Sequence, residues 1–372
     1  MKPAVTRRFP LIARLRPVCI PLTQRVADLQ QRAVLARERG DVASATSVFN
    51  LAALLASDCG MPDLARTWCH RLAHLALDHD HDPQHALEPI VNLARLHIRA
   101  GDGSAAWDLL ETLFQAIDTR TDTVIDGLTI PAARLTEEPD ARTKARTWLW
   151  TVLLGTGAHA LASAGRWDEA SHRLTRYKGV GARMLDGRQI TVIAHATAGR
   201  HQQARAMLEA TQPGEPWENA VTACLLLLMP GTDTRDDDAN TALTAYHALG
   251  PAKPGLTVFH TRLGLTLLDA LDNSHPAAEQ IAAGLVHHAA GDGYAARDLL
   301  THPSCLAISR QPTNQLKTLV SICGLDAGTL PIEDLRAMLH ALDVAESILI
   351  GAFARASDQP TSLASRQMEP RT

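Results

Sequence analysis

Small and large apolar residues recur along this chain at fixed distances from a set of glycines. Six times a glycine is followed five residues later by an alanine, in the pairs Gly40/Ala45, Gly60/Ala65, Gly101/Ala106, Gly165/Ala170, Gly199/Ala204 and Gly291/Ala296. Seven residues before the glycines stand, in turn, Ala33, Ala53, Ala94, Ala158, Val192 and Gly284. Nine residues after them stand Phe49, Cys69, Leu110, Leu174, Leu208 and Leu300. Such an internal repeat predicts an array of similar structural units.

A pair of helices joined at the glycine accounts for these spacings. A helix can end at a glycine in the left-handed conformation, and a polar residue or proline then begins the next helix. The residues that would begin it are Asp41, Pro62, Asp102, Asp168 and Asp292. The small residues let the two helices approach closely, and the large apolar residue fills the groove between them.

The small residue, the turn glycine, the later alanine and the large apolar position together resemble the tetratricopeptide repeat family. Gly165 and Gly199 are 34 residues apart, which is the usual length of that repeat, and residues 164–170 (AGRWDEA) give the clearest turn. The resemblance implies an all-α tetratricopeptide-like superhelix, or solenoid, with repeats in residues 21–118 and 147–330.

Three other segments lie outside the repeats. Residues 119–146 lose helical periodicity, and β-branched residues around Asp126 and Gly127 predict a hairpin over 123–130. Residues 331–356 predict a C-terminal capping helix, and the polar residues 357–372 a disordered tail. Residues 1–20 form a basic N-terminal arm, for which we expect a frayed terminus rather than the alternative, a docking segment for an anionic partner.

Composition narrows the class of protein. Of the 372 residues, 46% are hydrophobic and only 4% aromatic, which favours helices and a large core. A net charge of −4 argues against nucleic-acid binding. Residues 147–165 lack charged side chains, but their glycines and polar residues favour a buried helix over a membrane span.

The cysteines and the basic start of the chain bear on its compartment. None of the six cysteines is paired in a C-x-x-C spacing, as expected of reduced, buried thiols. Arg14, Arg16 and Pro17 interrupt the apolar stretch that a signal peptide needs. We therefore expect a cytoplasmic protein, and the bias toward Ala, Arg, Asp and His suggests a bacterium with a GC-rich genome.

Two segments carry candidate chemistry. His70, His74 and Asp78 share a helical face, as a metal site on a helix requires, but a solvated turn is the better interpretation of this region. Residues 178–189 contain a G-x-G, yet lack the strand that a phosphate-binding loop follows, so we interpret them as a link between helices. We expect no catalytic residues, no cofactor and no metal.

The resemblance also implies where a ligand would bind. In that family the first helix of each pair lines the concave groove, at positions about six, nine, ten and thirteen residues before the turn glycine. These positions hold Gln30, Asn50, Asn92, Arg95, His159, Asp186 and Gln189. Polar, lightly charged side chains of this kind suit the backbone of an extended peptide, although they are equally compatible with an ordinary solvent-facing surface.

Two functional classes remain open. The first is a non-enzymatic adaptor or regulatory protein of a bacterial cytoplasm that binds a peptide or protein, with no nucleic acid or membrane as partner. The alternative is an accessory protein of a biosynthetic pathway for a peptide natural product, which presents the substrate or scaffolds a partner enzyme.

Overall fold

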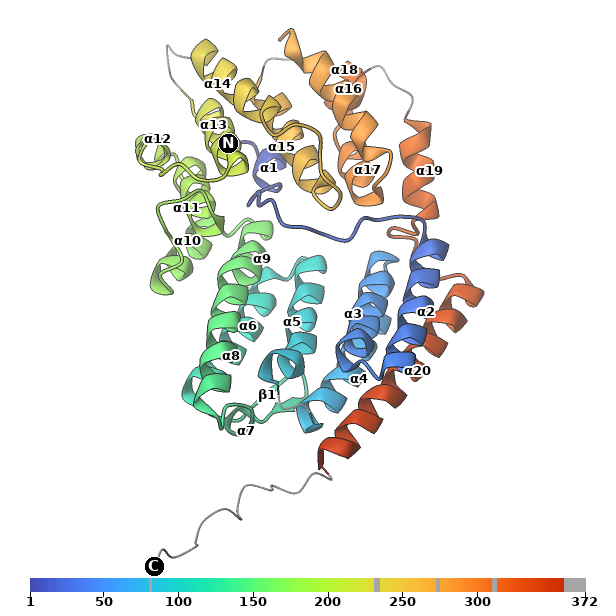
Figure 1. Ribbon diagram of the computed structural model, residues 1–372. Helices are drawn as coiled ribbons and strands as arrows, with labels where there is room; N and C mark the ends of the chain where they lie inside the picture. Colours follow the sequence, from blue (N-terminus) through green and yellow to red (C-terminus); the bar gives the residue numbers. More distant parts are fainter. Residues whose placement is uncertain (80–81, 231–234, 272–274, 310–312, 358–372) are drawn as a thin grey trace, which may run out of the picture.

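The computed structural model describes residues 1–79, 82–230, 235–271, 275–309 and 313–357, and helices dominate it (Figure 1). The first half contains α1 (Pro3–Thr6), α2 (Leu22–Arg39), α3 (Val42–Asp58), α4 (Pro62–His79), α5 (Pro83–Arg99), α6 (Gly103–Thr119), α7 (Ala132–Leu135), α8 (Pro139–Val152), a π-helical turn η1 (Leu153–Gly157) and α9 (Ala158–Ser163). The second half contains α10 (Trp167–Arg176), α11 (Asp186–Thr197), α12 (His201–Glu209), α13 (Pro216–Leu228), α14 (Arg235–His247), α15 (Thr257–Ala270), α16 (Ala277–Ala289), α17 (Gly293–Leu300), α18 (Pro303–Ser309), α19 (Asn314–Ile322) and α20 (Ile332–Ser357). Neighbouring helices pack against one another along the chain, which confirms the predicted all-α superhelical fold.

The glycine-centred turns form as their spacing predicts. Gly40, Gly101 and Gly165 have φ values of 62°, 81° and 75°, in the left-handed region that glycine enters without strain. After the first of these turns, the Asp41 carboxylate accepts hydrogen bonds from the backbone N–H groups of Ala43 and Ser44, and so begins α3. The copy at Gly291 departs from the pattern, because that glycine is not among the residues with positive φ.

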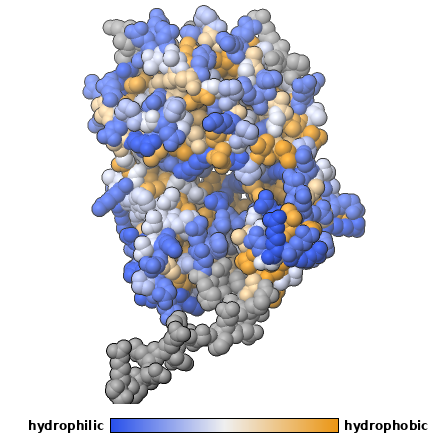
Figure 2. Space-filling model, in the orientation of Figure 1, coloured by the Kyte–Doolittle hydropathy of each residue, from blue (hydrophilic) through white to orange (hydrophobic). Residues whose placement is uncertain are grey.

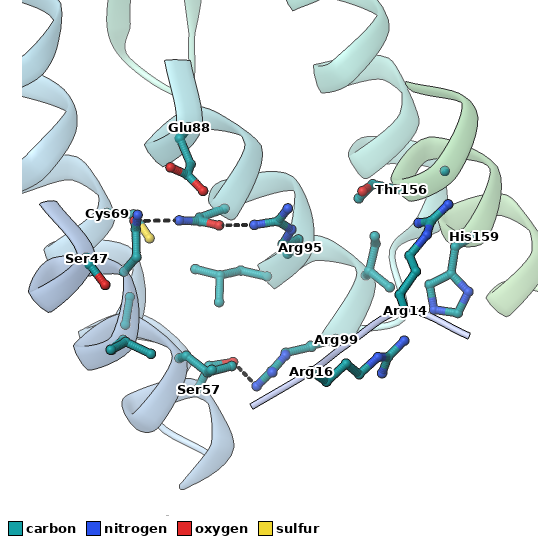
Figure 3. A pocket seen from close by; sticks show the side chains of 18 of the residues that line it. Arg14, Arg16, Ser47, Ser57, Cys69, Glu88, Arg95, Arg99, Thr156 and His159 are labelled. Carbon is teal, nitrogen blue, oxygen red and sulfur yellow. Dashed lines mark hydrogen bonds between the residues drawn. The ribbon is translucent and has the colours of Figure 1, made fainter. Parts of the chain in front are cut away.

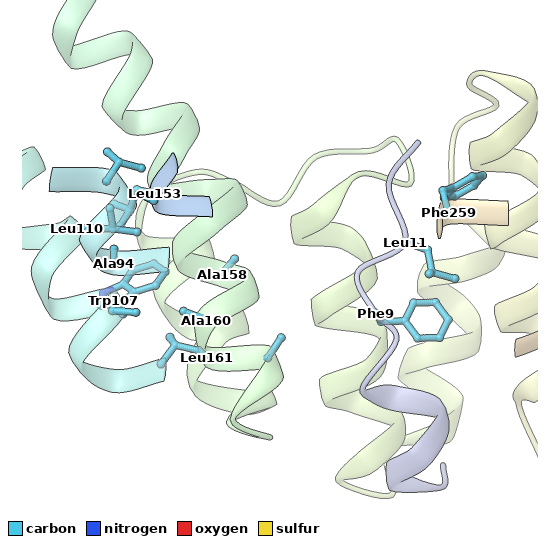
Figure 4. Packing of buried hydrophobic residues seen from close by; sticks show 14 of the residues in the cluster. Phe9, Leu11, Ala94, Trp107, Leu110, Leu153, Ala158, Ala160, Leu161 and Phe259 are labelled. Atoms are coloured by element: carbon cyan, nitrogen blue, oxygen red, sulfur yellow. The ribbon is translucent and has the colours of Figure 1, made fainter. Parts of the chain in front are cut away.

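In the first five copies the positions seven before and five after the glycine are buried, and Figure 4 shows two of them, whereas a Cβ atom on Gly284, in the last copy, would meet nothing within 4 Å. Ala94, Ala106 and Ala158 are fully buried. Trp107, next to Ala106 in α6, is itself fully buried and donates a hydrogen bond of 3.0 Å from its indole N–H to Glu111. A Cβ atom on Gly103 would lie 2.1 Å from the carbonyl oxygen of Ala160, so α6 and α9 are in backbone contact there. The predicted close approach of the helices is therefore present.

The segment between the repeats contains the predicted hairpin. Strands β1 (Thr123–Ile125) and β2 (Leu128–Ile130) are antiparallel, with Thr123 opposite Ile130. Positive φ angles at Asp126 and Gly127 form its two-residue turn. The non-helical part is shorter than expected, because Pro139 begins α8 in the position that proline favours at a helix start.

The C-terminal helix closes the superhelix on itself (Figure 1). Helix α20 packs against α2 and α3, so the last helix covers the first ones, as a capping helix should. The predicted disordered tail, beyond residue 357, lies outside the described residues.

A buried carboxylate lies at this closure. Asp58, at the end of α3, accepts hydrogen bonds of 2.8 Å from both Arg25 of α2 and Arg99 of α5. It also accepts one from the hydroxyl of Tyr294 in α17. The same aspartate offers its backbone carbonyl to the N–H of Asp326, 2.8 Å away. Hydrogen bonds to this one side chain thus connect α2 and α5, in the first half of the chain, with α17 in the second half.

The N-terminal arm differs from the frayed terminus expected. It crosses the interior of the molecule between the two halves, from α1 to the start of α2 (Figure 1). Phe9, Leu11 and Cys19 are buried, and Phe9 and Leu11 lie near Phe259 of α15 (Figure 4). Burial of these apolar side chains fixes a segment that has no regular secondary structure of its own.

Across the described residues, no helix has both the length and the apolarity needed to cross a membrane.

We expect Ala170→Trp to destabilise the fold, because this alanine is fully buried where α10 meets its neighbours. Overpacking of a core typically costs about 1–3 kcal/mol, and an indole adds more volume than most such changes. His172→Trp, at an exposed position of the same helix, is the matched control. A melting temperature that is unchanged in both variants would contradict the assignment of Ala170 to a buried position of the repeat.

We expect Asp58→Ala to loosen the closure. Removing one partner of a buried ion pair typically costs about 3–5 kcal/mol, because the remaining charge stays buried without compensation. The control is Asp343→Ala, which removes an exposed partner of Arg71 and should cost at most about 1 kcal/mol. Chemical denaturation measures both, and equal free energies of unfolding would show that the closure does not depend on Asp58.

Candidate functional site

Residues of the N-terminal arm alternate between two environments. Phe9 and Leu11 are buried, whereas Pro10, Ile12, Arg14 and Arg16 all line a cavity. This period of two is the periodicity of an extended chain, in which successive side chains point to opposite sides. At Phe9 and Leu11 one side of the arm therefore belongs to the core, although Leu15, farther along on that side, is 77% exposed. The other side forms a wall of the cavity.

Hydrogen bonds to the backbone hold the arm in place. The side-chain amide of Gln189 accepts from the Leu11 N–H at 2.7 Å and donates to the Leu11 carbonyl at 2.8 Å. Farther along, the Arg16 N–H donates to the carbonyl of Gly255 at 3.0 Å. The carbonyl of Cys19 accepts from the N–H of Gly293 at 2.8 Å. None of these bonds depends on the identity of the arm side chains.

The cavity has a volume of about 660 Å³ and lies between the arm and the inner helices α3, α5 and η1–α9 (Figure 3). The face of Figure 2 is hollowed between the two halves of the molecule, and both hydrophobic and hydrophilic residues reach that hollow. Its apolar lining includes Ile12, Leu51, Leu54, Leu96 and Ile98. This volume lies in the range of sites that bind small ligands or short peptide segments.

Two asparagines and an arginine form a chain of hydrogen bonds on one wall (Figure 3). Asn92 of α5 donates to the side-chain oxygen of Asn50 at 2.8 Å and accepts from Arg95 at 2.5 Å. Each side-chain amide can make further hydrogen bonds, because its nitrogen has two hydrogens and its oxygen two lone pairs. Asn92 therefore positions Arg95 and keeps some capacity to bind a ligand.

Guanidinium groups dominate the charge of the cavity. Arg14 donates to Asp186 at 2.7 Å, Arg262 to Asp298 at 2.6 Å, and Arg99 to Asp58 at 2.8 Å. Arg16 and Arg95 have no carboxylate within ion-pair distance among the described residues. Burial lowers the pKa of both, since the protein encloses them although solvent in the cavity still reaches them.

The cavity also perturbs two other titratable groups. Burial lowers the pKa of the His159 imidazole to about 4, with smaller contributions from the positive charges of Arg262, Arg16 and Arg14. The imidazole is therefore neutral near pH 7. Burial raises the pKa of Asp186, although the charge of Arg14 opposes this change.

A π-helical turn brings the arm close to one wall. Gly155 in η1 lies against Arg14, so that a Cβ atom there would be 2.9 Å from a guanidinium nitrogen. A larger residue would displace this side chain. Such π-helical turns occur frequently at functional sites.

The structure brings together five of the seven residues predicted for a ligand groove. Asn50, Asn92, Arg95, His159 and Asp186 line the cavity. Gln189 binds the arm instead and is fully buried. Gln30 is exposed and does not line the cavity.

The position of Gln30 has a simple cause. The turn at Gly40 joins α2 to α3, and the cavity is lined by α3 and by no residue of α2. The first glycine therefore marks the start of an inner helix, whereas at Gly60 and Gly101 the inner helix precedes the glycine. Counting back from Gly40 consequently reaches a helix on the outer side.

Sequence reasoning missed the arginines that come from outside the groove positions, namely Arg14, Arg16, Arg99 and Arg262. For Arg14 and Arg16, the signal in the sequence was the alternation of apolar with other residues in the arm, which is typical of an extended segment with two different sides. No signal in the sequence relates Arg262 to the arm, because the two are far apart in the chain.

The other candidate chemistry has structural explanations. His70 contacts Asp126 of the hairpin turn at 2.8 Å through its Nε2 atom. In the described part of the chain no three His, Cys, Asp or Glu side chains are grouped as a metal site, and residues 80–81 of the histidine-rich segment lie outside it. Residues 178–185 link α10 to α11, and Arg188 donates to the carbonyls of Gly181 and Met207.

Gln189→Leu should release the arm locally. Leucine has a similar size but leaves the buried N–H and carbonyl of Leu11 without partners, at a cost of about 1–3 kcal/mol for each group. Hydrogen–deuterium exchange should therefore become faster at residues 9–12. Gln202→Leu, at an exposed position of α12, is the control. Unchanged protection of the arm would show that its apolar side chains suffice to hold it.

Comparisons with protein-family models, with curated proteins and with solved structures gave no match to this chain.

Proposed function

We propose that this chain is a non-enzymatic, tetratricopeptide-like adaptor of a bacterial cytoplasm, which binds a short extended peptide segment of a partner protein in its central cavity. The observation that carries the proposal is the arm itself. A side-chain amide of an inner helix already binds an extended polypeptide through its backbone, at Leu11. A second extended segment beside the arm would meet amides of the same kind, those of Asn50 and Asn92.

Size and enclosure support a segment rather than a folded partner. A cavity of about 660 Å³ inside a closed array of helices accommodates a few residues of extended chain. Its mixed lining suits a peptide, because aliphatic walls receive side chains while amides bind the backbone. The six cysteines are all free and buried, as expected in a reducing compartment.

Site-specific photocrosslinking tests the proposal in host cells. A photoreactive amino acid replaces Leu54, which lines the cavity, or Gln30, which does not. We expect peptide segments to be crosslinked at position 54 and not at position 30. Equal capture at the two positions, or no peptide at position 54, would contradict a peptide site in the cavity.

The affinity of the captured peptide then identifies the residues that bind it. The Asn92→Ala/Arg95→Ala double variant should weaken binding by roughly ten- to a hundredfold, since a charge-assisted hydrogen bond contributes about 1.5–3 kcal/mol and each factor of ten is about 1.4 kcal/mol. Calorimetry with the synthetic peptide measures this change, and Gln30→Ala is the control. An unchanged affinity with an unchanged melting temperature would place the peptide on another surface.

A further inference from the structure

Positive charge is concentrated at the end of the cavity where the arm crosses it. Arg14 and Arg16 of the arm lie beside His159 of α9 (Figure 3). Arg262 of α15 lines the same region. Burial is the main cause of the lowered pKa of His159, and the three guanidinium charges add to it. We call Arg14, Arg16 and Arg262 the arginine cluster.

The carboxylates nearby do not balance this charge. Arg14 pairs with Asp186 and Arg262 pairs with Asp298. The guanidinium of Arg16 makes no hydrogen bond or ion pair within the described residues, so one positive charge faces the cavity without a partner. A neutral His159 adds no further charge. An anion would thus find a cationic site already formed.

The placement of the donors on several elements favours a tetrahedral anion. The cavity is lined by Arg14 and Arg16 from the arm, by Arg262 from α15, and by Thr156 and His159 from η1 and α9. A carboxylate is planar, and a single guanidinium fork can bind both of its oxygens. A phosphate group has acceptor oxygens on several sides and can use donors from different walls at once.

We propose that the arginine cluster binds a phosphate group, and that the peptide bound in the cavity therefore carries a phosphorylated side chain. That the phosphate belongs to a peptide rests on the proposed function. That the arginine cluster binds a phosphate group does not. The rest of the lining fits an aliphatic ester, because it includes Ile12, Leu96 and Ile98 and, in the described part of the chain, has no Phe, Tyr or Trp side chain, the large ring surfaces on which nucleobases stack.

Calorimetry of the full chain at constant ionic strength tests this proposal with four probes. They are inorganic phosphate, the capped tripeptide acetyl-Ala-phosphoSer-Ala-amide, its unphosphorylated form, and glutarate as a dicarboxylate. We expect both phosphate probes to bind, and the serine tripeptide and glutarate to bind at least tenfold more weakly. Tripeptide binding at least tenfold tighter than that of inorganic phosphate supports a phosphate ester as the ligand, whereas equal affinities would overturn that part.

Two variants locate the site. Arg16→Gln should weaken phosphate binding about tenfold or more, because a charge-assisted hydrogen bond is lost. It should leave the melting temperature unchanged, because this guanidinium makes no hydrogen bond or ion pair within the described residues. Arg7→Gln removes the same charge from an exposed position outside the cavity and should have no effect. Absence of phosphate binding, glutarate binding as tight as that of phosphate, or equal affinities of the two variants would each overturn the proposal.

The outcome is separable from that of the peptide site. Phosphate binding without any peptide crosslinked at position 54 would retain the arginine cluster and reject the proposed function. A crosslinked peptide without phosphate binding would retain the proposed function and reject the arginine cluster as a phosphate site.

Discussion

Helices that are far apart in this chain meet at the buried carboxylate of Asp58. It accepts hydrogen bonds from α2, α5 and α17, which are far apart in the chain. Without this contact and the packing of α20 against α2 and α3, an array of paired helices would remain an open superhelix whose curvature varies with each packing contact. The closure fixes that curvature, and with it the separation of the inner walls. A cavity of definite size is therefore a consequence of joining the two ends, not of any single repeat.

The arm changes what the interior can bind. An inner surface formed by repeats alone would offer polar side chains from one side only. The arm adds a second wall with Arg14 and Arg16, held by backbone hydrogen bonds that leave both guanidinium groups directed at the cavity. The site thus combines residues that lie on helices of the repeat pattern with residues of the arm, which lies outside that pattern. Of the five arginines that line the cavity, the arm supplies two, Arg14 and Arg16, and the helices supply the others.

The sequence predicts the parts of this structure that depend on local spacing. The turns at Gly40 and Gly165, the hairpin at Asp126 and Gly127, and the burial of Ala94 and Ala158 follow from contacts between residues near one another in the chain. The closure and the path of the arm depend on contacts between distant residues, such as Leu11 with Gln189, for which helical periodicity gives no signal. For the same reason, five of the predicted groove residues line the cavity, whereas Gln30 lies on a helix whose inner or outer placement depends on what packs beside it.

The long reach of the arm has a consequence for how the chain folds during synthesis. Its partner Gln189 follows Leu11 by 178 residues, and Asp292 follows Cys19 by 273. The arm leaves the ribosome before the surfaces that bury Phe9 and Leu11, which are synthesised much later. At about 5–20 residues per second, these apolar side chains stay exposed for roughly ten seconds or longer. The helices that follow the arm can pair locally in that time. The interior is therefore completed when the arm, although synthesised before these helices, takes its place between the two halves.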